Sequence, residues 1–176
     1  MHRHQLQQIV RFVLAGVLVT GAAMARPSMG WAQQLVFVVR HAERADAGGS
    51  VMTGATDPPL SAAGHTRADK LAGILSSAGI AGIYVTEYQR TRQTAAPLAA
   101  ALKLTPVVMA AGDSVALVAR IKATHPHDIV LIVGHANTVP EIVAAFGGPK
   151  VTVADDEYDK LFVVVPGTGT VATIKY

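Results

Sequence analysis

Short runs of apolar residues alternate with longer amphipathic stretches along most of this chain. Residues 35–39 (LVFVV) and 129–133 (IVLIV) are rich in β-branched residues and have the length of strands that are buried on both faces. Amphipathic segments of helical length follow them. Strands that alternate with helices predict a mostly parallel sheet flanked by helices, so we expect an α/β fold with three α/β/α layers.

The remaining segments fit this scheme. We expect further strands at residues 82–86 and 106–110, a loop over the Gly- and Pro-rich residues 46–59, and helices over residues 61–77, 91–102 and 113–124. Ser61 is the expected N-cap of the first helix. Pro97 inside the second predicts a kink or a late start. Thr138-Val-Pro-Glu141 predicts a capping box for a last helix, which Gly147-Gly-Pro149 ends.

The end of the chain has a different pattern. Residues 161–165 and 171–176 are apolar runs joined by Pro166-Gly-Thr-Gly169. Turn residues between two such runs predict a β-hairpin. We therefore expect a C-terminal hairpin that forms an antiparallel edge of the sheet.

The first 32 residues have the pattern of a secretory signal peptide. Arg3 and Arg11 precede an uncharged stretch of 14 residues, 12–25, which is shorter than the ~20 residues that a membrane-spanning helix needs. Small residues predict cleavage after Ala32 or Ala25, and Ala32 is favoured because a strand begins soon afterwards. We expect an exported, periplasmic protein without a stable membrane anchor, whose mature domain is residues 33–176.

Charge and cysteine content narrow the expected partners. Removing Arg3, Arg11 and Arg26 from the 15 basic residues leaves 12, which equals the 12 acidic residues. A neutral mature domain gives no support for broad binding to nucleic acid or anionic membranes. The chain has no cysteine, so neither a disulfide framework nor a lipid-modified cysteine is available.

Basic side chains gather at the predicted carboxyl ends of the strands, which is the edge where open parallel sheets bind ligands. Arg40, His41 and Arg44 follow the first strand, Arg90 follows the second, and His135 follows the fourth. Unpaired buried cations are costly, so acids or an anionic ligand must neutralise them. Arginine forks match phosphate oxygens. The pattern therefore predicts a pocket for a dianionic phosphoryl group.

Four segments resemble, in order, the motifs of the histidine phosphatase superfamily. They are Arg40-His41 with Arg44, Leu60-Ser-Ala-Ala-Gly64, Arg90-Thr-Arg-Gln-Thr-Ala95 and Val133-Gly-His135. Residues 158–164 also look like a late strand of that family. The resemblance implies that residues 33–176 form a histidine phosphatase-like catalytic domain that acts on a small phosphorylated substrate.

The resemblance also implies roles for these residues. His41 would attack phosphorus and become a phosphohistidine, while Arg40, Arg90 and His135, joined by Arg44, would bind the phosphate oxygens. A neutral imidazole is a good nucleophile near pH 7, and the cations would stabilise the transferring phosphoryl group, so no metal or cofactor is required. Ala42 and Thr86 depart mildly from the family pattern, which often has glycine and serine there.

The proton donor to the leaving group has three candidates. Asp113 is preferred because it follows the third predicted strand, although it is equally suited to cap a helix. Glu87 lies before Arg90, and it could instead neutralise a guanidinium. Glu43 could do the same for Arg44.

Alternative functions remain at this point: a phosphoglycerate-type mutase, a protein-phosphohistidine phosphatase and a non-catalytic phosphate-binding module. A mutase must retain a phosphoglycerate while it reorients, export would separate a protein-phosphohistidine phosphatase from cytoplasmic phosphorelays, and a binding module would form no phosphohistidine. His125-Pro-His127 is expected to be a solvated turn, and Asp155-Asp-Glu157 a solvated loop. The sequence specifies neither the substrate nor the oligomeric state.

Overall fold

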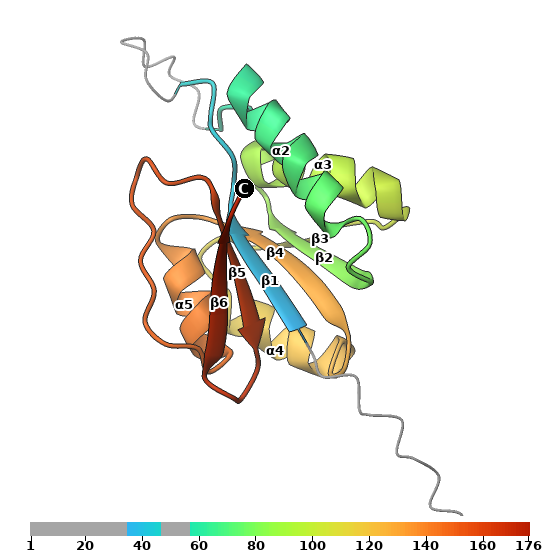
Figure 1. Ribbon diagram of the computed structural model, residues 1–176, viewed down its shortest axis with the longest axis vertical. Helices are drawn as coiled ribbons and strands as arrows, with labels where there is room; N and C mark the ends of the chain where they lie inside the picture. Colours follow the sequence, from blue (N-terminus) through green and yellow to red (C-terminus); the bar gives the residue numbers. More distant parts are fainter. Residues whose placement is uncertain (1–34, 47–56) are drawn as a thin grey trace, which may run out of the picture. The chain divides into compact units, whose positions relative to one another are not determined.

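The apolar runs form one six-stranded sheet. The computed structural model describes residues 35–46 and 57–176, all within one contact unit, Trp31–Tyr176. The strands are β1 (Leu35–Arg40), β2 (Ile80–Thr86), β3 (Val107–Met109), β4 (Ile129–Gly134), β5 (Lys160–Val165) and β6 (Thr170–Lys175). Their order across the sheet is β3-β2-β4-β1-β5-β6 (Figure 1).

Strand direction follows the expectation. β1, β2, β3 and β4 pair in parallel, whereas β5 and β6 pair antiparallel. Gly167 and Gly169 turn the hairpin with φ angles of 76° and 73°, which glycine adopts without steric cost. The mostly parallel sheet and its C-terminal hairpin edge are therefore confirmed.

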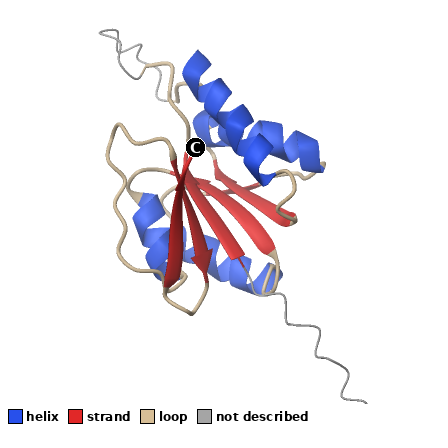
Figure 2. Ribbon diagram, viewed as in Figure 1, coloured by secondary structure: helices blue, strands red, loops and turns tan. Residues whose placement is uncertain are grey.

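Helices cover both faces of the sheet (Figure 2). They are α2 (Ala62–Leu75), α3 (Gln89–Leu102), α4 (Ser114–Thr124) and α5 (Thr138–Ala145). Alternate residues of β1 divide between the two layers: Phe37 and Val39 pack with α2 and α3, whereas Val36 and Val38 pack with α4 and α5. Each fully buried side chain of this size contributes about 1.5–3 kcal/mol, so both faces stabilise the central strands.

The first helix begins as predicted. The Ser61 hydroxyl accepts from Gly64 N at 3.1 Å, and Ala68, Leu71 and Leu75 form the buried stripe. A Cβ on Gly64 would collide with the backbone oxygen of Glu43. This glycine therefore lets α2 pack closely against the segment that follows β1.

The second helix starts two residues before the predicted Thr91, and Pro97 lies inside it. The predicted late start is thus wrong. Tyr88, the N-cap residue, supplies no side-chain cap, but the Asp57 carboxylate accepts from Gln89 N at 3.0 Å. An acid from a distant loop caps this helix, which local sequence does not reveal.

The capping box at α5 is also wrong, although the helix begins at Thr138 and ends before Gly147 as expected. Its N-cap is Asn137, which makes no side-chain cap bond. The Thr138 hydroxyl instead accepts from the backbone N of His135 at 3.0 Å. Thr138 therefore holds the turn that carries His135.

The predicted signal peptide and most of the loop over residues 46–59 lie outside the described residues. Within the described ranges, no helix combines the length and apolar character that crossing a membrane demands.

Candidate active site

Strand pairing brings the two predicted imidazoles together. β1 and β4 are neighbours in parallel register, with Arg40 opposite Gly134, and His41 N donates to Gly134 O at 2.9 Å. The rings of His41 and His135 lie 5.3 Å apart between centroids. Side chains that are 94 positions apart in the sequence thus share one edge of the sheet.

His41 is held with one nitrogen available. Its ring is buried, at 4% exposure, and its Nδ1 lies 2.8 Å from the carbonyl oxygen of Ala42. A carbonyl only accepts, so Nδ1 carries the proton and the lone pair is on Nε2. The adjacent Ala42 N donates to Thr94 Oγ1 at 2.9 Å, which ties this turn to α3.

Burial lowers the pKa of His41 to about 3, and His135, Arg90 and Arg40 add to the effect, whereas the Ala42 carbonyl opposes it. The imidazole is therefore neutral at pH 7. A neutral, buried imidazole with a directed lone pair is suited to nucleophilic attack.

His135 is oriented by hydroxyl groups. Its Nε2 lies 3.1 Å from Thr86 Oγ1, and its Nδ1 lies 3.4 Å from Arg90 Nη2. Arginine only donates, so Nδ1 accepts and Nε2–H donates to Thr86. Burial, followed by the charge of Arg90, lowers the pKa of His135 to about 4. The unliganded site therefore holds two neutral imidazoles at pH 7.

Arg90 reaches the site from the first turn of α3. Its Nη1 lies 3.6 Å from Asp57 Oδ1, with the side chain only 12% exposed, and its Cζ lies 4.1 Å from the centroid of the Tyr88 ring. Burial and then the charge of Arg44 lower its pKa. The site therefore concentrates more positive charge than Asp57 neutralises.

Arg40 is fixed by the segment before β5. Its Nη1 donates to the carbonyl oxygens of Ala154, Asp155 and Glu157 at 2.9, 2.9 and 3.2 Å, and its Cζ lies 4.0 Å from the centroid of the Tyr158 ring. The acidic run expected to be a solvated loop thus binds Arg40 through its backbone.

Two buried donors in this cluster lack a partner. Among the described residues, Arg40 Nε and Arg90 Nε are inaccessible and make no hydrogen bond. Leaving a buried charged donor unpaired is costly. A tetrahedral oxyanion bound beside the two arginines would offset the excess positive charge.

Arg44 and Glu43, which the sequence suggested as a possible ion pair, bind other partners. Arg44 Nε pairs with Asp46 at 3.0 Å. Glu43 does not neutralise Arg44, because both of its oxygens bind Arg67 on α2 at 2.6–2.9 Å. Burial opposes ionisation of Glu43, but the hydrogen bonds and charge of Arg67, a backbone hydrogen bond and the charge of Arg40 together hold the pKa of Glu43 below its usual value. Glu43 is thus a structural partner of α2.

The other two candidate acids lie at the ends of β2 and β3. Asp113 caps α4, because its Oδ1 accepts from Ala116 N at 2.8 Å, so its N-cap interpretation is confirmed. It lines a narrow crevice with Thr86 and Thr138 that His41 does not line. Glu87 accepts from Ala111 N at 2.9 Å, and its charge raises the pKa of His135 against the effect of burial.

Sequence reasoning missed four residues of this cluster: Asp57, Tyr88, Thr94 and Tyr158. Asp57 lies in the predicted loop over residues 46–59, where no pattern distinguished it. Neither tyrosine has a motif of its own. The only signals were that Tyr88 is close to Arg90 in the sequence and that Tyr158 is close to the late strand. Their contacts arise from the order of the strands.

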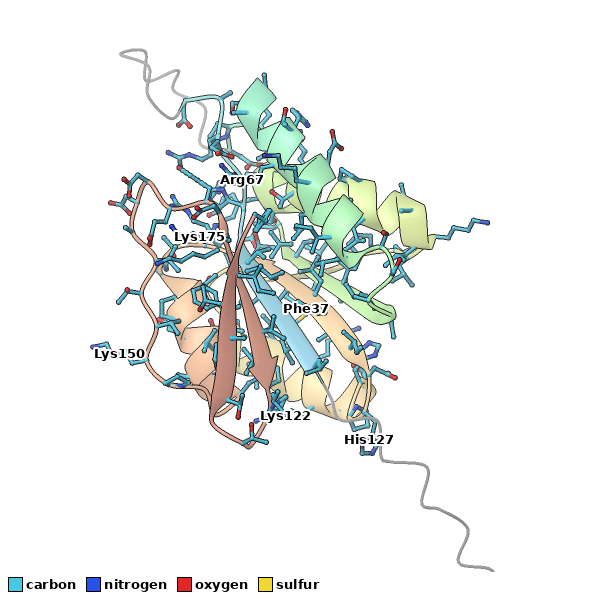
Figure 3. The ribbon with its side chains drawn as sticks, in the orientation of Figure 1. Phe37, Arg67, Lys122, His127, Lys150 and Lys175 are labelled. Atoms are coloured by element: carbon cyan, nitrogen blue, oxygen red, sulfur yellow. The ribbon has the colours of Figure 1, made fainter. Side chains whose placement is uncertain are left out.

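The predicted turn at His125-Pro-His127 is far from this cluster. Figure 3 shows His127 at the opposite end of the sheet from Arg67. His125 Nδ1 lies 2.9 Å from Asp128 Oδ2. Within the part of the chain that the structure describes, no group of three His, Cys, Asp or Glu side chains is arranged to hold a metal ion.

Comparisons with known proteins identify one matching family model. Residues 36–112 match the family model described as histidine phosphatase superfamily (branch 1). This range includes Arg40, His41, Arg44 and Arg90, and it ends before His135. No curated protein matches the chain.

Solved structures share the fold. The protein histidine phosphatase SixA complexed with tungstate is 20% identical, with a TM-score of 0.62 over 80% of this chain and 94% of that one. A putative alpha-ribazole-5'-P phosphatase from Escherichia coli is 13% identical, with a TM-score of 0.63 over 81% and 95%. A mycobacterial glucosyl-3-phosphoglycerate phosphatase with VO3 is 17% identical, with a TM-score of 0.58 over 80% and 96%. At these identities, the likeness shows the fold.

Proposed function

We propose that this chain is a member of the histidine phosphatase superfamily, whose family model matches residues 36–112, and that it hydrolyses a phosphate monoester through a phosphohistidine on His41. One observation carries the proposal. A buried, neutral imidazole whose Nδ1 is bound to Ala42 O lies beside two arginines with unpartnered buried Nε donors. A core histidine would need neither the available nitrogen nor the excess positive charge beside it.

The first step transfers the phosphoryl group to the enzyme. The Nε2 lone pair of His41 forms a bond to phosphorus as the bond from phosphorus to the ester oxygen breaks, and the leaving oxygen takes that electron pair and a proton from an acid. Nδ1–H keeps its bond to Ala42 O, which stabilises the positive charge on the ring. The second step is attack by water on phosphorus, which returns the electron pair to Nε2 and a proton to the acid's conjugate base.

The surrounding cations stabilise charge on the phosphoryl oxygens. In the proposal, the guanidinium groups of Arg40 and Arg90 bind equatorial oxygens, and Arg44 adds positive charge from the loop. A dianionic ligand would favour the protonated form of His135, whose Nδ1 would then donate to the phosphate while Nε2–H stays on Thr86. Positioning and electrostatics are the main contributions that phosphoryl transfer needs from a protein.

The proton donor remains a choice between two carboxylates. The chain's 12 acidic residues all lie in the described ranges, because residues 1–34 and 47–56 contain none. Glu43 is engaged by Arg67. We retain Asp113 as the proposed acid, and Glu87 is its competitor because its charge acts on His135.

The substrate and location belong to the same proposal. We expect a small or medium phosphate monoester hydrolysed in the periplasm after removal of residues 1–32. The names of the structural matches, which include a protein histidine phosphatase and a glucosyl-3-phosphoglycerate phosphatase, support phosphatase chemistry. They span different substrates, so they support the reaction class rather than one compound.

The test is hydrolysis of a chromogenic aryl phosphate, with chelator present, by the wild-type protein and by His41→Ala. We expect turnover only in the wild type and a phosphoryl adduct on His41 in mass spectra of acid-free quenched enzyme. Asp128→Asn, which alters a charge at His125, is the control and should retain activity. Turnover by His41→Ala at the wild-type rate would exclude the histidine nucleophile.

A further inference from the structure

Two tyrosines cover the faces of the guanidinium groups assigned above to the phosphate. The Cζ of Arg90 lies 4.1 Å from the centroid of the Tyr88 ring. The Cζ of Arg40 lies 4.0 Å from the centroid of the Tyr158 ring. Both distances are well within the ~6 Å range of cation–π attraction. The two arginines thus have equivalent aromatic partners that come from different parts of the chain.

The same rings contact the imidazoles. Tyr88 meets His135 edge-on, with centroids 5.5 Å apart at 90°, and Tyr158 lies tilted to His41 at 6.1 Å. Each half of the site therefore contains one histidine, one arginine and one tyrosine in mutual contact. The repeat of this arrangement indicates that the two tyrosines have the same role.

The geometry of a guanidinium explains the choice of partner. All of its N–H groups lie in one plane, so a carboxylate that neutralises the charge also occupies the donors. An aromatic face attracts the cation from above the plane and leaves the in-plane donors available. A phosphate site needs positive charge held in place while some of these donors stay unused.

Arg67 shows the opposite case in the same protein. Its Nε and Nη2 bind both oxygens of Glu43, and its Nη1 donates to Tyr176 O at 2.9 Å. This guanidinium has its fork occupied and serves to connect elements. Arg40 and Arg90, in contrast, retain a buried Nε without a partner among the described residues.

The segment before β5 completes the support of Arg40. Three of its carbonyl oxygens accept from Arg40 Nη1, and its shape is maintained by Glu157, which accepts from Ala154 N at 2.9 Å and pairs with Lys160 at 2.7 Å. The backbone fixes one end of the guanidinium, and the ring of Tyr158 fixes its plane.

We propose that Tyr88 and Tyr158 are positioning residues, which hold Arg90 and Arg40 by their faces so that both guanidinium groups serve one tetrahedral oxyanion. This rests on the proposed function for the identity of the oxyanion. The aromatic face is the required feature, and the phenol hydroxyl is not.

The test compares leucine and phenylalanine at each tyrosine, using orthovanadate affinity by calorimetry and KM for an aryl phosphate. Tyr88→Leu and Tyr158→Leu should each weaken vanadate binding and raise KM by about tenfold, while Tyr88→Phe and Tyr158→Phe stay within about twofold of wild type. Tyr176→Leu removes a ring 5.8 Å from Arg67, outside the site, and is the matched control with unchanged affinity.

The outcomes separate the two proposals. Leucine variants that fold and bind vanadate like the wild type would overturn the positioning role, as would equal losses in the phenylalanine variants. A wild type that neither binds vanadate nor hydrolyses esters would overturn the proposed function instead. The two tyrosines belong to different segments, so each pair of leucine and phenylalanine variants tests its own tyrosine independently. Where a leucine variant does not fold, a Tyr158→Trp or Tyr88→Trp variant that retains affinity confirms the need for a ring.

Discussion

His41 and His135 are buried among cations, and this makes the stability of the protein depend on pH. Their folded pKa values are about 3 and about 4, below the value of ~6.5 for an unfolded histidine. Between these values the unfolded chain binds protons that the folded chain does not bind, so acid favours unfolding. The burial that keeps both imidazoles neutral therefore lowers the free energy of unfolding at acidic pH.

We expect the free energy of unfolding to decrease as the pH falls from 7 to 5, by up to about 1.4 kcal/mol per pH unit for each of these histidines. Urea unfolding at several pH values measures this slope. His41→Gln and His135→Gln should each make it shallower, whereas His65→Gln, on the exposed face of α2, should not. Equal slopes in all variants would contradict the lowered pKa values.

The proton donor is a second property of single residues. Asp113→Asn should slow hydrolysis of alkyl phosphates, which have poor leaving groups, by about 10²-fold, and that of nitrophenyl phosphate far less. Glu87→Gln is the matched variant and should show no such dependence on the leaving group. The reverse result would transfer the acid role to Glu87, and equal slowing of both esters by Asp113→Asn would remove Asp113 from it.

At the scale of elements, helix starts connect the site to the scaffold. The Asp57 carboxylate caps α3 and lies beside Arg90, and Thr138 of α5 binds the backbone of His135. An acid of the site thus caps α3, and the threonine predicted to cap α5 holds the turn of His135 instead. Asp57 and Thr138 therefore each connect the start of a helix to a residue of the site.

Two glycines of α2 test how closely this helix must approach the site. Gly64→Ala should destabilise the protein by about 1–3 kcal/mol and reduce activity, because the new Cβ meets the rigid backbone of Glu43. Gly73→Ala, where a Cβ has open space, should stabilise it by about 0.5–1 kcal/mol. Thermal unfolding compares the two, and similar shifts would contradict the close approach.

At the scale of the whole molecule, strand order assembles the site. Placing β1 between β4 and β5 sets His41 beside His135 on one side and beside Tyr158 on the other. The Glu43–Arg67 pair then joins the segment after β1 to α2 and, through Tyr176 O, to the end of the chain. The cluster around His41 and His135 is thus built from both halves of the sequence.

Export is a prediction about the full chain. Expression of all 176 residues in a bacterial host should yield a periplasmic protein that begins at Gln33 or Arg26, because the n-region, apolar stretch and small residues match a cleavable signal. Mass spectrometry of the periplasmic fraction determines the start. Charged residues in place of both Ala25 and Ala32 should block processing, and an unprocessed cytoplasmic wild type would contradict the prediction.

The sequence by itself determined the layers of the fold, the hairpin edge and the basic residue types that follow β1, β2 and β4, because periodicity, turn residues and strand ends are encoded over a few neighbouring positions. Ser61 and Asp113 were identifiable as caps for the same reason. Local patterns failed for the start of α3, which the distant Asp57 caps, and for the capping box at Thr138, whose hydroxyl binds His135 N instead.

Only the tertiary structure decided which charge meets which partner. Glu43 follows His41 closely in the sequence, yet it binds Arg67 rather than Arg44, and Arg40 binds the backbone of residues 154–157 and the ring of Tyr158. These pairings depend on which strands lie side by side. Strand order follows from packing of the complete sheet against four helices, and no short segment encodes it.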